Sequence, residues 1–244
     1  MAKHGKRYIE AAKLIDPMKL YAPSEAAALL KKTATAKFDQ TIEVHIRLGV
    51  DPRQSDEMVR GTVGLPHGTG KKLRIVVFAQ GDKATEATKA GADVVGAADL
   101  VAKIEGGWLE FDIVIATPDM MGQVGKLGKV LGRKGLMPNP KAGTITTDLE
   151  RTIGELKSGR VEYKVDKIGA IHLGIGKASF TEEQIVGNLS ALVDAVNRAK
   201  PTGLKGTYLK GISVSTSMGP GIAIDVPRSE EHTSELQSRE TISY

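Results

Sequence analysis

Residues 73–79 read LRIVVFA, a nearly unbroken apolar run in the middle of the chain. A second run of this kind, FDIVIA, lies at residues 111–116. Between them the pattern predicts helices at 82–90 and 98–104, with a short apolar segment at 92–95. Apolar strands that alternate with helices are typical of a parallel sheet covered by helices on both sides. The middle of the chain is therefore predicted to be a three-layer α/β domain.

The segments on either side of this block have a different pattern. Residues 42–48 read IEVHIRL, in which apolar residues alternate with charged and polar ones, as in a strand with one buried face. Further strands are predicted at 161–165, 170–175, 208–217 and 222–226. These segments lie on both sides of the middle block and resemble each other more than they resemble it.

Three helices are predicted in the outer segments. The strongest signal spans residues 181–199, which carry one apolar stripe and have Thr181 as the expected N-cap. A second helix is predicted at 24–32, with Ser24 as its N-cap. The first is predicted at 4–15, and an Asp-Pro pair is expected to stop it.

Together these patterns indicate an α/β fold with two domains. One is a discontinuous α+β sandwich formed by residues 1–66 and 159–227. The other is an inserted α/β domain at residues 67–158. Both crossings lie at junctions that contain glycine, which would permit a hinge.

The charge of the chain is unevenly distributed. The 244 residues carry a net charge of +5, and because residues 228–244 are acidic, the rest is more basic than this value indicates. Two long stretches, residues 120–147 and 195–224, contain no acidic residue. Such stretches are either solvated faces or surfaces that attract a phosphate backbone, and two in one chain favour the second interpretation.

The composition excludes several classes of protein. The absence of cysteine excludes disulfides, thiolate zinc sites and a cysteine nucleophile. The five scattered histidines do not predict a metal site. No apolar run approaches the roughly 18 residues of a membrane span, and no apolar stretch opens the chain. We therefore expect a cytoplasmic protein with no membrane partner.

The motifs of cofactor enzymes are incomplete in this chain. Gly68 and Gly70 precede a strand, whereas the glycines of a dinucleotide-binding fingerprint follow one. The segment 174–179 lacks the hydroxyl residue that follows the lysine of a phosphate loop, because Ala178 stands there. No paired carboxylates or Ser/His/Asp set occur at diagnostic spacing. An α/β enzyme with a nucleotide cofactor is therefore a disfavoured alternative, and we expect no enzyme activity, no cofactor and no small-molecule substrate.

Three segments are candidates for contact with RNA. Phe38, beside Lys37, is either ordinary core or a platform that stacks on a base or sugar. Residues 215–221, STSMGPG, are either a plain hairpin turn or a source of hydroxyls and main-chain groups for sugar contacts. Residues 131–141 show no helical or strand period and are predicted to be a loop that offers cations. A general DNA-binding protein remains a third possibility.

Four strings in this order then become recognisable: VRGTVGLPHGTGK at 59–71, LGRKGLMPNPKAGT at 131–144, GAIHLGIGKASF at 169–180 and STSMGPG at 215–221. Together they closely resemble the bacterial ribosomal protein L-one family, the protein of the mobile stalk of the large subunit. The resemblance covers residues 1 to about 226.

This resemblance implies a fold and a function. It implies that the domain built from both outer segments carries the main rRNA contact and that the inserted domain is Rossmann-like. It further implies binding to the rRNA stalk of the large subunit, contact with tRNA that leaves the exit site, and repression of the protein's own operon mRNA. The implied main RNA surface comprises Lys37, Phe38, Thr41, Glu43, Lys177, Ser217, Met218 and Gly219. Secondary contacts to RNA or tRNA are implied for Arg133, Lys134 and Lys141.

Two positions depart from the family pattern. The family usually has Thr where this chain has Ser217; a hydroxyl is kept, so the contact is expected to persist. The family often has Gly-Pro-Arg at residues 132–134, where this chain reads Gly-Arg-Lys, which makes that segment more basic.

The last residues do not fit the family. Residues 228–238 read RSEEHTSELQS, which resembles the translation of a sequencing-library adapter. We expect residues 228–244 to be a non-native, disordered tail that does not serve RNA binding. A genuine acidic tail is the alternative, and an intact genomic reading frame through this string would support it.

Overall fold

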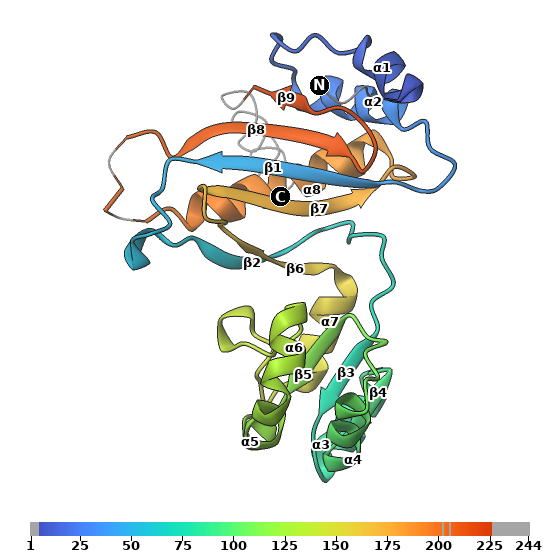
Figure 1. Cartoon of the computed structure of the whole chain (residues 1–244), viewed down its shortest axis with the longest axis vertical. Coiled ribbons are helices and arrows are strands. Elements are labelled where there is room, and N and C mark those ends of the chain that lie inside the picture. The colour runs from blue at the N-terminus through green and yellow to red at the C-terminus, as the bar shows by residue number, and fades with distance from the viewer. Residues whose placement is uncertain (1–4, 202, 205, 226–244) are drawn as a thin grey trace, which may run out of the picture. The chain divides into compact units, whose positions relative to one another are not determined.

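The computed structural model describes residues 5–201, 203–204 and 206–225 (Figure 1). The predicted tail at 228–244 lies outside these residues, as do residue 4 of the first predicted helix and residue 226 of the last predicted strand. Within the described part of the chain, no helix is long and apolar enough to cross a membrane.

The fold is mixed α/β, as predicted. The elements in chain order are α1 Lys6–Ala12, α2 Pro23–Thr33, β1 Thr41–Leu48, η1 Ser55–Glu57, β2 Arg60–Gly64, β3 Ile75–Phe78, α3 Asp82–Lys89, β4 Val94–Gly96, α4 Ala98–Glu105, β5 Ile113–Ala116, η2 Pro118–Met120, α5 Met121–Val124, η3 Gly125–Leu127, α6 Gly128–Lys134, η4 Pro140–Ala142, α7 Leu149–Ser158, β6 Arg160–Lys164, β7 Ala170–Lys177, α8 Glu182–Arg198, β8 Leu209–Thr216 and β9 Ile222–Ile224.

The chain divides into two compact units. Unit 1 combines the residues up to Gly70 with those from Val161 onward, and unit 2 spans Lys71–Arg160. Unit 1 is therefore discontinuous in sequence, and unit 2 is inserted into it.

The core of unit 1 is a four-stranded sheet in the order β7-β1-β8-β9. Strand β1 pairs antiparallel with β7 on one edge and with β8 on the other. In Figure 1 the blue β1 lies between strands coloured for the C-terminal part of the chain. The predicted alternation in β1 is confirmed, because Ile42, Val44, Ile46 and Leu48 are buried in one cluster with the apolar faces of α2 and α8.

Helix α8 is fixed at both ends and in its middle. Thr181 caps the N-terminus and forms a capping box with Gln184, which confirms the predicted cap. Near the C-terminus the hydroxyl of Tyr208 donates to the carbonyl of Val196 at 3.0 Å. Burial raises the pKa of this tyrosine to about 12, so it stays a donor at neutral pH.

In the middle of α8 a buried amide holds two other segments. The Asn188 side chain is fully buried. Its Nδ2 donates to the carbonyl oxygens of Ile175 at 2.7 Å and Gly68 at 2.9 Å, and its Oδ1 accepts from the His67 N–H at 3.1 Å. This one side chain joins β7 to the segment that leaves unit 1.

Unit 2 is a three-layer structure. Its parallel sheet has the order β4-β3-β5. Val76 and Phe78 of β3 belong to one apolar cluster, with residues of α4 and α6, whereas Ile75 and Val77 belong to a second cluster with residues of α3 and α7. The unbroken apolar run predicted this arrangement, because both faces of the strand are buried.

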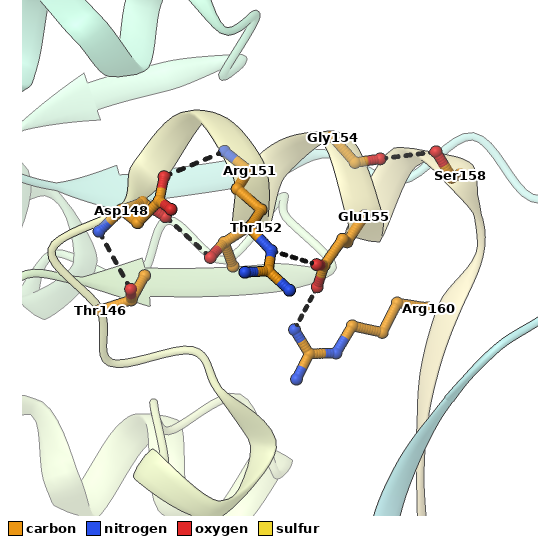
Figure 2. Close-up of polar contacts among 8 residues, drawn as sticks. All are labelled: Thr146, Asp148, Arg151, Thr152, Gly154, Glu155, Ser158 and Arg160. Atoms are coloured by element: carbon orange, nitrogen blue, oxygen red, sulfur yellow. Dashed lines mark hydrogen bonds and ion pairs between the residues drawn. The ribbon is translucent and has the colours of Figure 1, made fainter. Parts of the chain in front are cut away.

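Helix α7 returns the chain to unit 1 (Figure 2). Its N-cap Asp148 accepts from the Arg151 N–H, and Arg151 pairs with Glu155 one turn later at 2.8 Å. Glu155 also pairs with Arg160, at 2.7 Å, just past the left-handed Gly159 that ends the helix. The start of β6 is thereby tied to the end of α7.

Three local predictions need correction. Helix α2 begins at Pro23 with Ala22 as N-cap, so Ser24 is not the cap; proline lacks the N–H that the first helical position cannot use. Helix α1 ends at Ala12 rather than at residue 15. The predicted loop at 131–141 is partly helical, because Leu131 is buried against the sheet of unit 2 as part of α6.

Replacing Asn188 with Ala should lower the free energy of unfolding of unit 1 by about 1–3 kcal/mol, because it leaves buried main-chain groups without partners. The control is Asn197→Ala at a partly exposed position of α8, which shares the gain in helix propensity and should change stability by less than about 0.5 kcal/mol. Denaturant unfolding, with hydrogen exchange to locate the loss in unit 1, measures both. Equal effects of the two substitutions would contradict this role.

Candidate nucleic-acid interface

One end of the unit 1 sheet gathers most of the predicted RNA-contact residues. Thr41 begins β1, and its partner in the register is Lys177, which ends β7. On the other edge Ile42 pairs with Thr216, the last residue of β8, so Ser217 follows directly beside Thr41. Three strands distant in sequence therefore present their ends at one place, here called the strand-end cluster: Lys37, Phe38, Thr41, Glu43, Lys177, Ser217, Met218 and Gly219.

Main-chain and hydroxyl contacts fix this cluster. The Ser217 N–H donates to the Thr41 carbonyl at 3.0 Å, and the Thr41 N–H donates to the Ser217 hydroxyl at 3.1 Å. The Lys177 Nζ donates to the Thr41 hydroxyl at 2.9 Å. A serine at position 217 is thus sufficient for the two hydrogen bonds with Thr41 of β1.

The turn after β8 is held by a residue that the sequence did not single out. Gln40 is buried, and its side-chain oxygen accepts from the Met218 N–H at 3.1 Å. The Met218 side chain itself stays 66% exposed. No local pattern marks Gln40, because its role exists only once β1 and β8 are paired.

The aromatic candidate points outward. Phe38 is 57% exposed, so its interpretation as ordinary core is wrong. Lys37 is also exposed. Glu43 is partly exposed in β1, two residues after Thr41. The cluster therefore offers an apolar ring, two ammonium groups, hydroxyls and a carboxylate within one surface.

Such a set of groups suits RNA. Ammonium groups attract phosphates, hydroxyls and a carboxylate can bond sugar 2′-hydroxyls or base edges, and an exposed ring can stack on a base. In the described residues no group of three or more His, Asp or Glu side chains could hold a metal ion.

The remaining candidates belong to unit 2. Arg133 and Lys134 are exposed on the last turn of α6, where the Arg133 Nε donates to the Lys129 carbonyl at 2.9 Å. Lys141 is exposed on a tight turn that the Asn139 side chain caps by accepting from the Lys141 N–H at 2.8 Å. All three residues belong to unit 2, whereas the strand-end cluster belongs to unit 1.

A model of the ribosomal protein L1p/L10e family matches residues 30–220. The chain belongs to this family. The match reaches into both units and includes strands β1, β7 and β8 of the unit 1 sheet up to the turn after β8, whereas β9 lies beyond its end.

Membership in the ribosomal protein L1p/L10e family decides between the functional classes that the sequence left open. The chain is a structural protein of the ribosome that binds rRNA, and the family is not one of enzymes.

The glycines at residues 68 and 70 serve a structural purpose here: both have positive φ, and Gly70 lies against Lys177 and Phe180.

The glycine of the turn after β8 leaves no room for a side chain. A Cβ on Gly219 would lie 2.3 Å from the Thr216 Oγ1, whereas a Cβ on Gly221 would meet nothing within 4 Å. Gly219→Ala should therefore lower the free energy of unfolding by about 1–3 kcal/mol, through overpacking. Gly221→Ala should be nearly neutral, and denaturant unfolding compares the two.

A second substitution tests the cause. The Thr216 Oγ1 is buried and has no hydrogen-bond partner among the described residues. Adding Thr216→Ala to Gly219→Ala removes the colliding oxygen and should restore part of the lost stability. If Gly219→Ala and Gly221→Ala were equally stable, the close contact would not be the constraint.

Proposed function

We propose that the strand-end cluster of unit 1 is the main contact with the rRNA stalk of the large subunit. The observation that carries the proposal is that three strand ends bring exposed Phe38, the Thr41–Ser217 exchange and the Lys177 ammonium together on one surface. The hydroxyls can bond the sugar 2′-hydroxyl, which only RNA has, whereas the ring and the ammonium can stack on a base and neutralise a phosphate of any nucleic acid.

The groups of the cluster make different contacts with the RNA. Lys37 and Lys177 neutralise phosphates, Phe38 and the exposed Met218 side chain contact a base or sugar, and Glu43 accepts hydrogen bonds. Gly219 packs closely on Thr216 and has no side chain, so the RNA can approach the main chain of this turn. Shape and main-chain contacts thus dominate, in keeping with the low aromatic content of 4%.

Unit 2 is proposed to touch tRNA. Its exposed cations Arg133, Lys134 and Lys141 lie in the acid-free stretch 120–147 and form a surface for the backbone of tRNA that leaves the exit site. The same strand-end cluster that holds stalk rRNA would also hold a similar structure in the protein's own operon mRNA and so repress its translation. The ribosome in the cytoplasm is the proposed location.

The full chain should bind a stalk rRNA fragment more tightly than a duplex RNA of equal length. If roughly six phosphates are neutralised, affinity should fall about 10³-fold between 50 and 200 mM salt. A Phe38→Ala and Ser217→Val double variant should lose the preference for the stalk, because stacking contributes about 1–3 kcal/mol per base. Equilibrium binding titrations measure all of these.

The matched control is Met58→Ala, which removes another exposed apolar side chain of unit 1 outside the cluster. It should keep the preference for the stalk. Operon mRNA should compete with the stalk fragment for the wild-type chain. Equal binding of stalk and duplex RNA by the wild type would refute the proposed site.

Removing charge from unit 2 should affect tRNA binding but not binding of the stalk fragment. Arg133→Gln with Lys134→Gln should weaken tRNA binding and reduce its salt slope by about two, because two phosphate contacts are lost. Affinity for the stalk fragment should be unchanged. Lys83→Gln with Lys89→Gln on α3 removes the same charge elsewhere in unit 2 and is the control. Equal losses of tRNA affinity in both pairs would show that only net charge acts.

A further inference from the structure

The face of the unit 1 sheet that points away from α2 and α8 carries only polar and small side chains along β7, β1 and β8. In Figure 1 helix α8 passes behind these strands. On this face lie Glu43, His45 and Arg47 of β1, His172 and Gly174 of β7, and Gly211, Ser213 and Ser215 of β8. The face continues directly from the strand-end cluster, with which it shares Glu43.

A chain of polar contacts crosses this face. The Ser215 Oγ lies 3.2 Å from the His45 Nε2, and the His45 Nδ1 lies 2.8 Å from the His172 Nδ1. The His172 Nε2 lies 3.4 Å from an Asp166 oxygen. Two imidazoles on neighbouring strands are thus joined directly, although the side chain of His172 is half exposed to solvent.

The contacts determine where the protons lie in the uncharged pair. Hydrogen bonds from main-chain N–H groups, chiefly that of Ala170, lower the pKa of Asp166, so its carboxylate only accepts. His172 must then carry its proton on Nε2 and accept through Nδ1, and His45 donates from Nδ1. The free lone pair on the His45 Nε2 accepts from the Ser215 hydroxyl.

This arrangement has room for one added proton. A proton on the His45 Nε2 reverses the contact with the Ser215 hydroxyl, which can also accept, and leaves the bond between the imidazoles intact. A proton on the His172 Nδ1 as well would set two N–H groups against each other at 2.8 Å. The pair is therefore built to hold at most one positive charge.

The surroundings disfavour a positive charge on His45 in the free protein. Burial and then His172 lower the pKa of His45, and Glu43 opposes them only in part. The other groups that face the pair are Arg47 along β1, Asp166 before β7, and the uncharged Ser213 and Ser215 on β8.

We propose that this sheet face is a second contact region for the RNA backbone and that the His45–His172 pair takes up one proton when a phosphate binds there. The proposal rests on the proposed function of the strand-end cluster. At about 3.3 Å per residue, the face from Thr41 to Arg47 is about 20 Å long, enough for several consecutive nucleotides. Histidines, hydroxyls and Arg47 are donors for phosphate oxygens, and a phosphate favours the charged imidazole.

The linkage has a definite sign. The bound state holds more protons on the pair than the free state, so RNA binding should strengthen as pH falls through the range between the free and the bound pKa of His45. One linked proton limits the change to about tenfold per pH unit. We expect the dissociation constant of the stalk fragment to be about three- to tenfold lower at about pH 6 than at about pH 8.

The test is the binding of the full chain to a stalk fragment without terminal phosphates, which would themselves titrate near pH 6. Calorimetry in buffers of different ionisation enthalpy counts the protons taken up, and NMR follows the His45 titration in the free and bound wild-type chain. His45→Gln with His172→Gln should remove the pH dependence. His67→Gln removes an imidazole outside this face and should keep it.

The outcomes are distinguishable. A uniform loss of affinity in the double variant with an unchanged pH slope would mean that the histidines only support the fold, and it would overturn the inference. An unchanged His45 pKa on RNA binding would overturn it without any variant. If the wild-type chain showed no preference for stalk over duplex RNA, the proposed function itself would be refuted.

Discussion

The hydrogen bonding of β1 on both edges is the constraint on which unit 1 depends. Both partners, β7 and β8, come from beyond the inserted unit. A strand that is central in a sheet cannot leave either edge unpaired without exposing main-chain donors and acceptors in the core. The outer segments must therefore meet. The chain leaves unit 1 after β2 and returns to it at β6, and these two strands pair with each other.

The same constraint assembles the candidate interface. No short segment contains it: Thr41, Lys177 and Ser217 reach one surface only because the register of β1 with β7 and β8 places three strand ends together. The rigid sheet fixes the positions of the hydroxyls and the ammonium group, and the turn after β8 adds exposed main chain. RNA binding at this candidate interface would then require little rearrangement of the protein, which reduces the cost of ordering on binding.

The sequence predicted most strongly where one physical effect dominates. The alternation in 42–48 and the apolar run in 73–79 were sufficient for the strands, because burial of one face or both leaves a direct mark on the residue pattern. The cap of α8 at Thr181 was equally clear. The sequence could not decide whether Phe38 is buried or exposed, since an aromatic residue before a strand fits both. The hydrogen bond from the Met218 N–H to the Gln40 side chain became visible only once β1 and β8 were paired. Helix α6 was missed because its glycines disfavour a helix, whereas burial of Leu131 outweighs that propensity.

The place of β1 in the sheet also has a consequence for synthesis. Thr41 and Ser217 are separated by 176 residues. At about 5–20 residues per second, a ribosome needs roughly ten to thirty seconds to make that stretch. During most of this time neither β7 nor β8 has been made, whereas every strand of the unit 2 sheet finds its neighbours within unit 2. A nascent chain can therefore complete its inserted unit early, but it gains the candidate RNA surface only after Ser217 has emerged, and a nascent copy shorter than this would lack the proposed surface.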